Sequence, residues 1–374
     1  MNNRENINAI LHYKKYERMP IVSFGFWNET VTKWADEGFI TREEAHGYNT
    51  CGDNSEGDNS IMKKLGFDFN WNSCAGMDVA LSPCFATEIL EVKDDGLQIM
   101  RDNNGLIVQV KPGIISIPSE IGTSLTGREA WEELYLPKLQ FRKERVAIEH
   151  FKNLTDNSNR TVPLGLHCGS LMGTIRNLLG VEHLSYLYAD DEDLYVEIIN
   201  TFGDLSYNCV KVALETGAKF DYAHYWEDIC FKNGPLVSPT VFKELVGPHY
   251  KKTTALLNSF GIDIVSLDCD GCIDSLIPTW LENGVNTMFP IEVGTWNASI
   301  APWREKYGKQ IRGVGGMNKT VFAYDYKAID AEIERLKPLI ELGGYIPCPD
   351  HRIAPDAKWV NVQYYCDKMH KILD

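Results

Sequence analysis

The stretch GIDIVSLDCDGCIDSLIPTWLENGVNTMFPIE, residues 261–292, contains the unit that decides the fold. It reads as an apolar strand over 263–268, a helix over 272–283 that ends before a glycine, and a second strand over 286–292. Strands joined through a helix in this way lie parallel in one sheet. The stretch therefore predicts an α/β fold in which helices pack against a parallel sheet.

The same alternation of strand and helix recurs on both sides of this unit. Further strands are predicted over 20–26, 67–71, 162–166, 219–225, 310–316 and 344–348. Helices are predicted over 238–261, where Ser238 is a good N-cap, and over 326–342. Eight strands are the number in a (β/α)8 barrel. No glycine-rich dinucleotide fingerprint follows the first strands, which argues against a doubly wound open sheet.

We predict one domain over residues 1–374, a single (β/α)8 TIM barrel with an N-terminal extension. A small β-meander insertion is predicted over residues 84–117. Its segments ATEILEVK, LQIMRD and LIVQVK alternate between apolar and polar residues, and the sequences DDG and NNG between them are turn signals.

Composition and charge exclude several classes of protein. The chain has 374 residues, of which 44% are apolar and 24% charged, as in ordinary globular domains. Its net charge of −15 argues against binding to nucleic acid or to an acidic membrane surface. No apolar run approaches the roughly 18 residues of a membrane span, and the polar N-terminus lacks the order of a signal peptide. The ten cysteines show no disulfide framework, so we predict a cytoplasmic protein with reduced thiols.

Polar and ionisable residues gather where the predicted strands end. In a barrel, the active site lies at the carboxyl ends of the strands. The candidates found there are His167, His224, Trp226, Glu227, Asp268, Asp270, Glu292, Asn318 and His351. Because the strand pattern selects these positions without reference to their chemistry, we expect one site built from several of them.

Asp268 and Asp270 are the candidate metal ligands. Side chains two apart on an extended segment point to the same side, and two close carboxylates repel unless a cation or a proton lies between them. Together with His351 they would form a mixed oxygen and nitrogen set of the kind that zinc accepts. The alternative is a turn over residues 268–271 whose aspartates cap the next helix. Cys269 and the cysteine three residues later have no second pair to complete a four-cysteine zinc site.

The other candidates each have a functional and a structural interpretation. His224 and Glu227 are an acid/base pair or part of a surface loop. Glu292 is a general acid with a raised pKa or a member of a structural salt bridge. His167 and Cys168 are a pair of ligands, or Cys168 is packed in the core and His167 is a pocket residue that contacts the substrate, which is the interpretation we favour.

Trp27 and Trp226 form a platform for the substrate or belong to the core. Asn318, after the strand at 310–316, is a further candidate for substrate binding.

Five segments resemble a known family. They are NRENINAILHYKKYERMPIVSF (3–24), with Glu-Arg-x-Pro before the first strand, WEDICFKNGPLVSPTVFKELVGPHYKK (226–252), SLDCDGCIDSLIPTWLENGVNTMFPIEVG (266–294), RGVGGMNK (312–319) and GGYIPCPDHRIAPDAKWVNVQYY (343–365). The chain resembles the uroporphyrinogen decarboxylase superfamily, in particular its corrinoid-dependent methyltransferase-like branch. The resemblance implies a (β/α)8 barrel with its pocket at the carboxyl ends of the strands.

Departures from the family pattern select the branch. The decarboxylase carries an arginine-rich segment near its N-terminus that binds the acidic porphyrinogen, whereas this chain has FGFWNE at residues 24–29. Because an octa-anionic substrate needs that arginine clamp, we expect no uroporphyrinogen decarboxylation.

The resemblance also implies a metal. In thiol-methylating members, zinc is held by a His-x-Cys-Gly motif and a later cysteine. Asp268, Asp270 and His351 fall at those three positions, and a shift of register would make Cys269 or Cys348 a ligand instead. Oxygen and nitrogen ligands leave zinc a stronger Lewis acid than thiolates do.

The resemblance implies the substrate-side methyltransferase of an anaerobic corrinoid system. It would move a methyl group from a small methylated donor, a methyl ether or a methylamine, to the Co(I) centre of a separate corrinoid protein. The metal, Glu292 or His224 would stabilise the leaving group. The alternatives are methyl transfer from the corrinoid to a thiol or a folate, a metal-independent decarboxylase or lyase, and a non-catalytic corrinoid binder. Barrels of this kind occur as monomers and as homodimers.

Overall fold

A parallel sheet of seven strands forms the centre of the molecule, for which a computed structural model describes residues 1–111 and 118–373. The strand order is β15-β14-β13-β12-β9-β8-β3, and every neighbouring pair is parallel. The strands are β3 (Cys74–Ala75), β8 (Gly165–His167), β9 (Tyr222–Trp226), β12 (Val265–Asp268), β13 (Thr287–Phe289), β14 (Arg312–Met317) and β15 (Tyr345–Pro349). The predicted α/β class with a parallel sheet is therefore confirmed.

Two short strands lie beside the ends of this sheet. β1 (Val22–Ser23) pairs in parallel with β2 (Phe69–Asn70), and Phe26 forms an isolated parallel bridge with Ile353 beyond β15. The chain then passes from β2 through a turn to β3. Where a barrel would have one continuous second strand, this protein has two short ones, of which β2 pairs with β1 and β3 pairs with β8. Because of this break, the described residues do not form the continuous closed ladder that the predicted TIM barrel requires.

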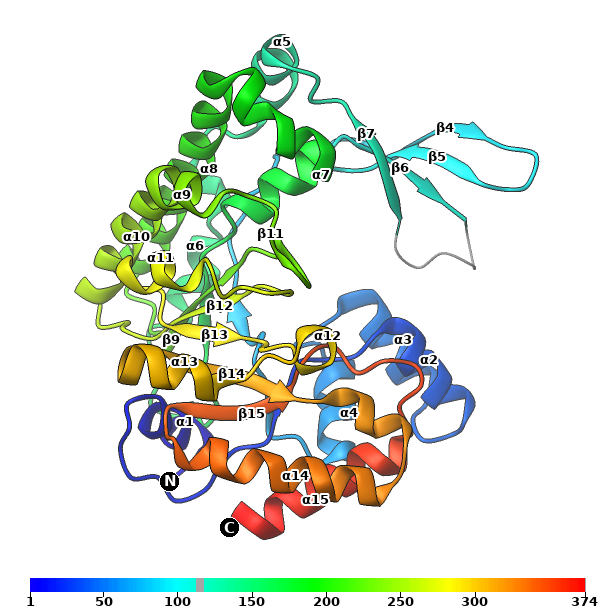
Figure 1. The fold of residues 1–374 in the computed structure, drawn as a ribbon, viewed down its shortest axis with the longest axis vertical. Helices are drawn as coiled ribbons and strands as arrows, with labels where there is room; N and C mark the ends of the chain where they lie inside the picture. The colour runs from blue at the N-terminus through cyan, green and yellow to red at the C-terminus, as the bar shows by residue number, and fades with distance from the viewer. Residues whose placement is uncertain (112–117, 374) are drawn as a thin grey trace.

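Helices connect most of the strands and lie outside the sheet (Figure 1). The longer ones are α1 (Asn3–Leu11), α2 (Asn28–Asp36), α3 (Arg42–Cys51), α4 (Glu56–Leu65), α7 (Met172–Asp190), α8 (Glu192–Glu215), α10 (Gly247–Ser259), α13 (Ile300–Tyr307), α14 (Tyr326–Glu341) and α15 (Trp359–Leu373). The shorter ones are α5 (Arg128–Ala130), α6 (Ile148–Lys152), α9 (Pro239–Val241), α11 (Ile277–Glu282) and α12 (Val293–Trp296). The helix predicted over 326–342 is confirmed as α14.

The two remaining predicted helices differ in detail from the structure. The helix expected over 238–261 consists of α9, a π-helical turn (Phe242–Val246) and α10. The helix expected over 272–283 is shorter, because α11 begins only at Ile277. The preceding residues form a loop in which Gly271 N–H donates to Glu292 and Cys272 N–H donates to the carbonyl of Phe231. No helix among the described residues is long and apolar enough to cross a membrane.

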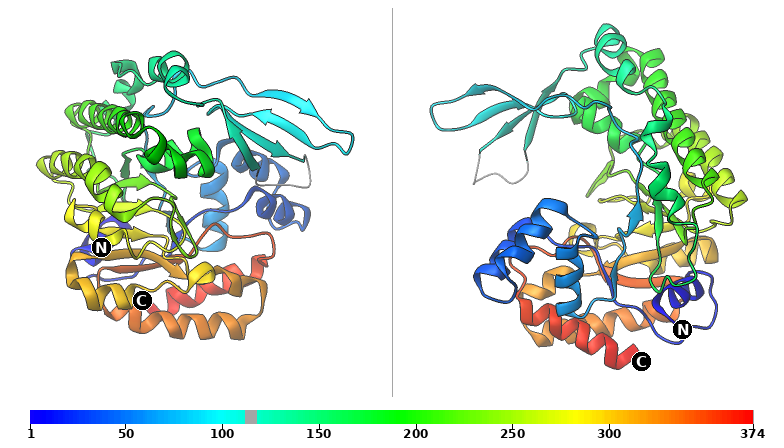
Figure 2. Two further views of the ribbon diagram at one scale, coloured as in Figure 1. Left: turned by 45° about the horizontal axis from the view of Figure 1, so that its top comes forward. Right: turned by 180° about the vertical axis from the view of Figure 1, so that it is seen from behind.

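Three helices occupy the connection between β1 and β2. Helices α2, α3 and α4 follow one another there, and they lie beside the end of β15 (Figure 2). Thr41 begins α3 with a capping box, in which its side chain accepts from Glu44 N–H and Glu44 accepts in return. The loop between α3 and α4 carries Asp53 toward the ends of the strands.

The predicted meander is a four-stranded antiparallel sheet that projects away from the parallel sheet (Figures 1 and 2). Its strands are β4 (Glu88–Val92), β5 (Gln98–Arg101), β6 (Leu106–Val110) and β7 (Ser119–Thr123). The sheet extends beyond the predicted boundary at 117, since β7 was not predicted, and residues 112–117 lie outside the described residues. Two hydrogen bonds attach this sheet to helix α7. The Thr123 hydroxyl donates to the carbonyl of Leu178, and the Glu120 carboxylate accepts from Val181 N–H.

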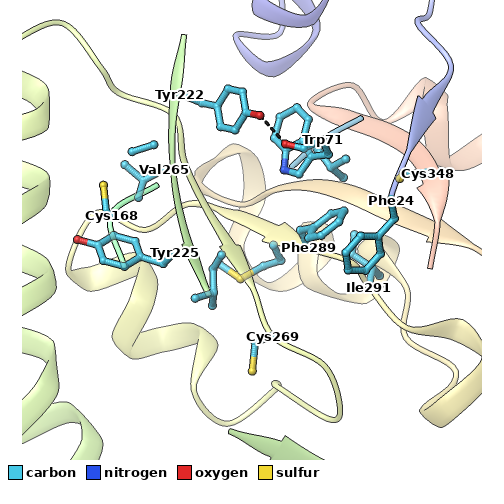
Figure 3. Close-up of a cluster of buried hydrophobic side chains, with 14 of the residues drawn as sticks. Phe24, Trp71, Cys168, Tyr222, Tyr225, Val265, Cys269, Phe289, Ile291 and Cys348 are labelled. Carbon is cyan, nitrogen blue, oxygen red and sulfur yellow. Dashed lines mark hydrogen bonds between the residues drawn. The ribbon is translucent and has the colours of Figure 1, made fainter. Parts of the chain in front are cut away.

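Aromatic side chains fill the space enclosed by the strands (Figure 3). Trp71 stacks on Tyr222 with ring centroids 4.4 Å apart, and the Tyr222 hydroxyl donates to the Trp71 carbonyl. Phe24 meets Phe289 edge to face at 4.4 Å. These buried rings pack the interior between the strands. The residues at the carboxyl ends of the strands lie beyond this packed core and face the solvent.

Candidate functional site

A cavity of about 460 Å³ lies at the carboxyl ends of the strands. The predicted site residues that line it are Trp27, His167, His224, Trp226, Asp268, Asp270 and His351. The lining residues that were not predicted are Phe24, Asp53, Asn54, Asn72, Asp228 and Arg352. The structure thus brings together seven side chains from segments far apart in the sequence, as the strand pattern led us to expect.

Asp270 and His351 form an ion-pair contact in the wall of this cavity. Asp270 Oδ2 lies 3.1 Å from His351 Nε2. The other carboxylate oxygen of Asp270, Oδ1, and the other ring nitrogen of His351, Nδ1, are both buried. Neither has a hydrogen-bond partner among the described residues. Trp27 stacks on the imidazole at 5.5 Å, and Phe24 lies at 5.4 Å from it. The imidazole is therefore held in place by aromatic packing and by one carboxylate.

Asp268 ends strand β12 and is only 8% exposed. Its backbone carbonyl accepts from Glu227 N–H, while its carboxylate accepts no hydrogen bond from any described residue and lines the cavity. Burial raises the pKa of Asp268 well above its usual range, and the charges of Asp270 and Asp228 raise it further. The Asp268 carboxylate therefore lies in a largely buried environment without the hydrogen-bond donor or cation that usually accompanies a buried carboxylate.

Two of the three histidines that line the cavity, His167 and His224, are neutral at neutral pH. Burial and the neighbouring His167 lower the pKa of His224 to about 3, and burial also lowers the pKa of His167. His224 Nδ1 lies 3.2 Å from Ser266 Oγ, and Gly169 N–H donates to His167 Nδ1 at 3.0 Å. Both imidazoles can form hydrogen bonds to a ligand. Because neither is protonated to imidazolium at neutral pH, neither is suited to protonate a leaving group.

Arg352 and Asp53 close one side of the cavity. Arg352 donates from both terminal nitrogens to the carboxylate of Asp53, and its Nη1 also lies 3.2 Å from the Tyr48 hydroxyl. Gly25 lies against this pair, with a positive φ of 88°. A Cβ atom at Gly25 would come within 2.5 Å of Asp53 Oδ1 and 2.8 Å of Arg352 Nη1.

Replacing Gly25 by alanine is therefore expected to break the Asp53–Arg352 contact, because the added methyl group would overlap with the side-chain atoms of both partners. We expect a loss of about 2–3 kcal/mol in unfolding free energy, from strain at positive φ plus the disrupted buried pair. Denaturant unfolding measures this loss. Gly38→Ala is the matched control, since Gly38 has a φ of 83° and nothing within 4 Å of the added atom. Equal losses in the two variants would mean that Gly25 serves only the backbone.

Arg176 and Asp228 form a second charged pair at the cavity. Arg176 Nη1 donates to Asp228 Oδ2 at 3.1 Å, and its guanidinium lies 5.7 Å from the ring centre of Trp226. Burial raises the pKa of Asp228, and Arg176 opposes this shift. Asp228 has a φ of 44°, which is uncommon for a residue with a side chain and directs its carboxylate into the cavity.

Glu227 does not line the cavity but anchors helix α7. Its carboxylate is fully buried and accepts from the backbone N–H groups of Leu171, Met172 and Gly173 at 2.8–2.9 Å, and from the Tyr250 hydroxyl. Burial raises its pKa, and these donors oppose the rise. The predicted acid/base pair with His224 is not assembled, because Glu227 points away from the cavity into the start of α7.

Glu292 and Asn318 also lie outside the cavity lining. Glu292 accepts from Gly271 N–H at 2.6 Å and from the Thr295 hydroxyl, so it fixes the loop that carries Asp270. Burial and the charge of Asp270 raise its pKa. Asn318 accepts from Thr320 N–H and caps the short helix that follows β14. Glu292 therefore positions the loop of Asp270, whereas Asn318 has a capping role after β14.

The described residues do not contain three histidine, cysteine, aspartate or glutamate side chains grouped closely enough to hold a metal ion. Asp270 and His351 contact each other, and Asp268 does not complete a three-ligand set with them. Cys269 and Cys348, the ligands in a shifted register, are buried and absent from the cavity lining. The residues as placed do not fit the zinc centre that the resemblance implies.

Three charged residues of the cavity were missed by the sequence reasoning. Asp53 lies in a loop between two helices, where no strand pattern pointed to it. Asp228 and Arg352 directly follow the predicted residues Glu227 and His351, so their adjacency was the signal that could have found them. Charge pairing between distant segments, which the sequence does not reveal, is what brings them to the site.

Comparison with known proteins agrees with this architecture. Over its whole length the chain is similar in structure to a methyltransferase from Methanosarcina mazei, with 15% identity, full coverage of both chains and a TM-score of 0.62. It is also similar to a B12-independent methionine synthase from a Shewanella species, with 11% identity, 95% and 99% coverage and a TM-score of 0.49. No curated protein matches the chain. The profile of the uroporphyrinogen decarboxylase (URO-D) family matches residues 105–372, well over half of the sequence, and the chain therefore belongs to that family.

Proposed function

We propose that the protein is a methyltransferase of a corrinoid system, which moves a methyl group from a small methylated donor to the Co(I) centre of a separate corrinoid protein. The observation that carries this proposal is the composition of the cavity. It combines four carboxylates and three aromatic side chains with one arginine, and that arginine is already paired with Asp53. Membership of the URO-D family supports an enzyme.

This composition argues against a porphyrinogen as the substrate. A polyanionic substrate needs several unpaired cations. Here Asp228, Asp268 and Asp270 would repel its carboxylates, and Arg352 is committed to Asp53. A small methylated donor makes no such demand on the cavity. Decarboxylation of uroporphyrinogen is therefore the member activity that this site supports least.

The proposed reaction requires the protein to bind and orient the donor and to exclude water. The Co(I) acceptor is itself the nucleophile, so the protein need not supply one. Phe24, Trp27 and Trp226 offer apolar surface against which a methyl group can pack. For a donor whose leaving group departs as an anion, such as a methyl ether, His351 Nε2 is the atom that could supply a proton.

Anaerobic incubation with chemically reduced free cob(I)alamin tests the proposal. Tetramethylammonium, trimethylamine and a methoxylated benzoate serve as donors, and conversion of cob(I)alamin to methylcob(III)alamin is followed by its absorbance. We expect methylation from at least one donor, dependent on the enzyme. Loss of carbon dioxide from a carboxylated substrate in the absence of cobalt would support a lyase instead. Tight corrinoid binding without turnover of any donor would support a non-catalytic binder.

A further inference from the structure

We infer that the methyl donor is an organic cation, a methylated ammonium compound, and that Asp268 is the residue that binds its charge. This inference rests on the proposed function and deepens it by naming the class of donor. Two independent observations carry it. One is the balance of charge among the side chains of the cavity, and the other is the buried carboxylate of Asp268, which faces the cavity without a partner.

Three of the four carboxylates in the cavity wall have a basic partner. Asp53 is bound by both terminal nitrogens of Arg352. Asp228 accepts from Arg176, and Asp270 contacts His351. Asp53 and Asp228 each lie against an arginine, and Asp270 lies against an imidazole nitrogen, so each of these three carboxylates already has a neighbouring side chain as a partner.

Asp268 is the fourth carboxylate of the cavity wall, and it lacks a basic partner among the described residues. No described residue donates a hydrogen bond to it or forms an ion pair with it, although it is more than nine-tenths buried. Arg352 acts on it at a distance, but that guanidinium is held by Asp53. A buried carboxylate without a partner is costly, whereas a cation in the cavity would remove the cost. The cavity is therefore complementary to a ligand that carries a positive charge.

The aromatic residues of the cavity suit an organic cation better than a hydrated ion. Trp27 and Trp226 lie in the same lining as Asp268, and Phe24 lies beside His351. Tryptophan faces attract quaternary and tertiary ammonium groups, whose methyl groups also gain from apolar contact. A metal ion at the same place would need a third close ligand, and the described residues do not provide one.

The chemistry of an ammonium donor is consistent with a site of this kind. In the transfer, the C–N bond breaks and its electron pair stays on nitrogen, which leaves as a neutral amine. The new bond to carbon is formed by the electron pair of Co(I), which is formally oxidised to Co(III). Because the leaving group is neutral, the step requires neither a Lewis acid nor a proton at the moment of departure. The carboxylate therefore contributes to donor binding more than to the rate of the chemical step.

A pair of matched ligands tests the inference on the full chain without any corrinoid. Choline carries a trimethylammonium group, and 3,3-dimethylbutan-1-ol has the same shape with carbon in place of nitrogen. Isothermal titration calorimetry on metal-free protein is expected to show choline binding at least about tenfold more tightly than the alcohol, because only choline has the charge. Equal affinities for the two ligands would overturn the inference without any variant.

Variants then locate the charge that binds choline. D268N keeps the shape of the side chain and is expected to remove most of the preference for choline over the alcohol. D204N is the control, because Asp204 is exposed, pairs with Lys252 on the surface and changes the net charge by the same amount. Thermal unfolding checks that both variants fold. An unchanged preference in folded D268N, or tight Zn²⁺ binding that depends on Asp268 together with no preference for choline, would overturn the inference.

These outcomes are separate from those of the methylation assay. Methylation of cob(I)alamin from a methoxylated donor alone, with no preference for choline, would leave the proposed function standing and overturn the inference. A strong preference for choline without methylation from any donor would support a cation-binding site and contradict the proposed function.

Discussion

Replacing Glu227 by alanine is expected to lower the free energy of unfolding by about 3–5 kcal/mol, since it leaves several buried donors unsatisfied at once. The carboxylate accepts from three consecutive backbone N–H groups at the start of α7 and from the Tyr250 hydroxyl, and it has no exposed surface. These donors cannot reach water when the acceptor is removed. Urea unfolding followed by circular dichroism measures the loss.

Two further variants separate this structural role from a catalytic one. Tyr250→Phe removes one of the donors to Glu227 and is expected to cost only about 1 kcal/mol. Glu215→Ala, on the exposed end of α8, removes a carboxylate without buried partners and is expected to cost little. A Glu227→Ala protein of nearly normal stability whose activity is lost would contradict our assignment and restore the acid/base role predicted from the sequence.

Replacing His351 by alanine is expected to lower kcat for methyl transfer by about a hundredfold, without raising KM for a cationic donor. The imidazole stacks on Trp27 and contacts the carboxylate of Asp270, so its loss releases one wall of the cavity and admits water. Misplacement of a donor by about 1 Å is sufficient for a loss of this size. The same change leaves Asp270 without a partner, which adds a second attraction for a cation but in the wrong position.

Steady-state kinetics with the donor that proves active measures the two parameters separately. His351→Gln keeps an N–H group that can reach Asp270, and it is expected to recover part of kcat. A rise in KM with unchanged kcat would instead mean that His351 binds the donor directly. Normal values of both parameters in His351→Ala would remove the Asp270–His351 pair from the site.

The strand and helix pattern predicted the parallel sheet, and most of its candidate residues line the cavity at the carboxyl ends of the strands. It succeeded because a buried parallel strand such as β12 is a short apolar run whose last residue, Asp268, changes abruptly to polar. The division of the second barrel strand into β2 and β3 was not predicted, since two residues are too few to produce a pattern. Tertiary hydrogen bonds decide that break.

The roles of individual residues were harder to predict than their positions. Glu227 and Asp268 both follow apolar strand residues and have the same chemistry. The carboxylate of Glu227 accepts from five donors, whereas that of Asp268 accepts from none of the described residues. That difference depends on where α7 begins relative to β9, which is a property of the packed structure. The metal ligand set was likewise inferred from spacing, and only the geometry shows that Asp270 and His351 meet while Asp268 stands apart.

The proposed function depends on the transfer of a methyl group from a donor to Co(I) at the cavity. The most direct test is to supply trimethylamine or tetramethylammonium with deuterated methyl groups to the wild-type protein and to D268N, and to measure the deuterated methyl group on cobalamin by mass spectrometry. We expect the wild type to transfer the intact deuterated methyl group. We expect D268N to transfer much less of it when the concentration of the donor is limiting. No label on cobalt from these donors or from a deuterated methoxylated benzoate would contradict methyl transfer by this protein, whereas equal transfer by the two proteins would contradict the role of Asp268 in binding the donor.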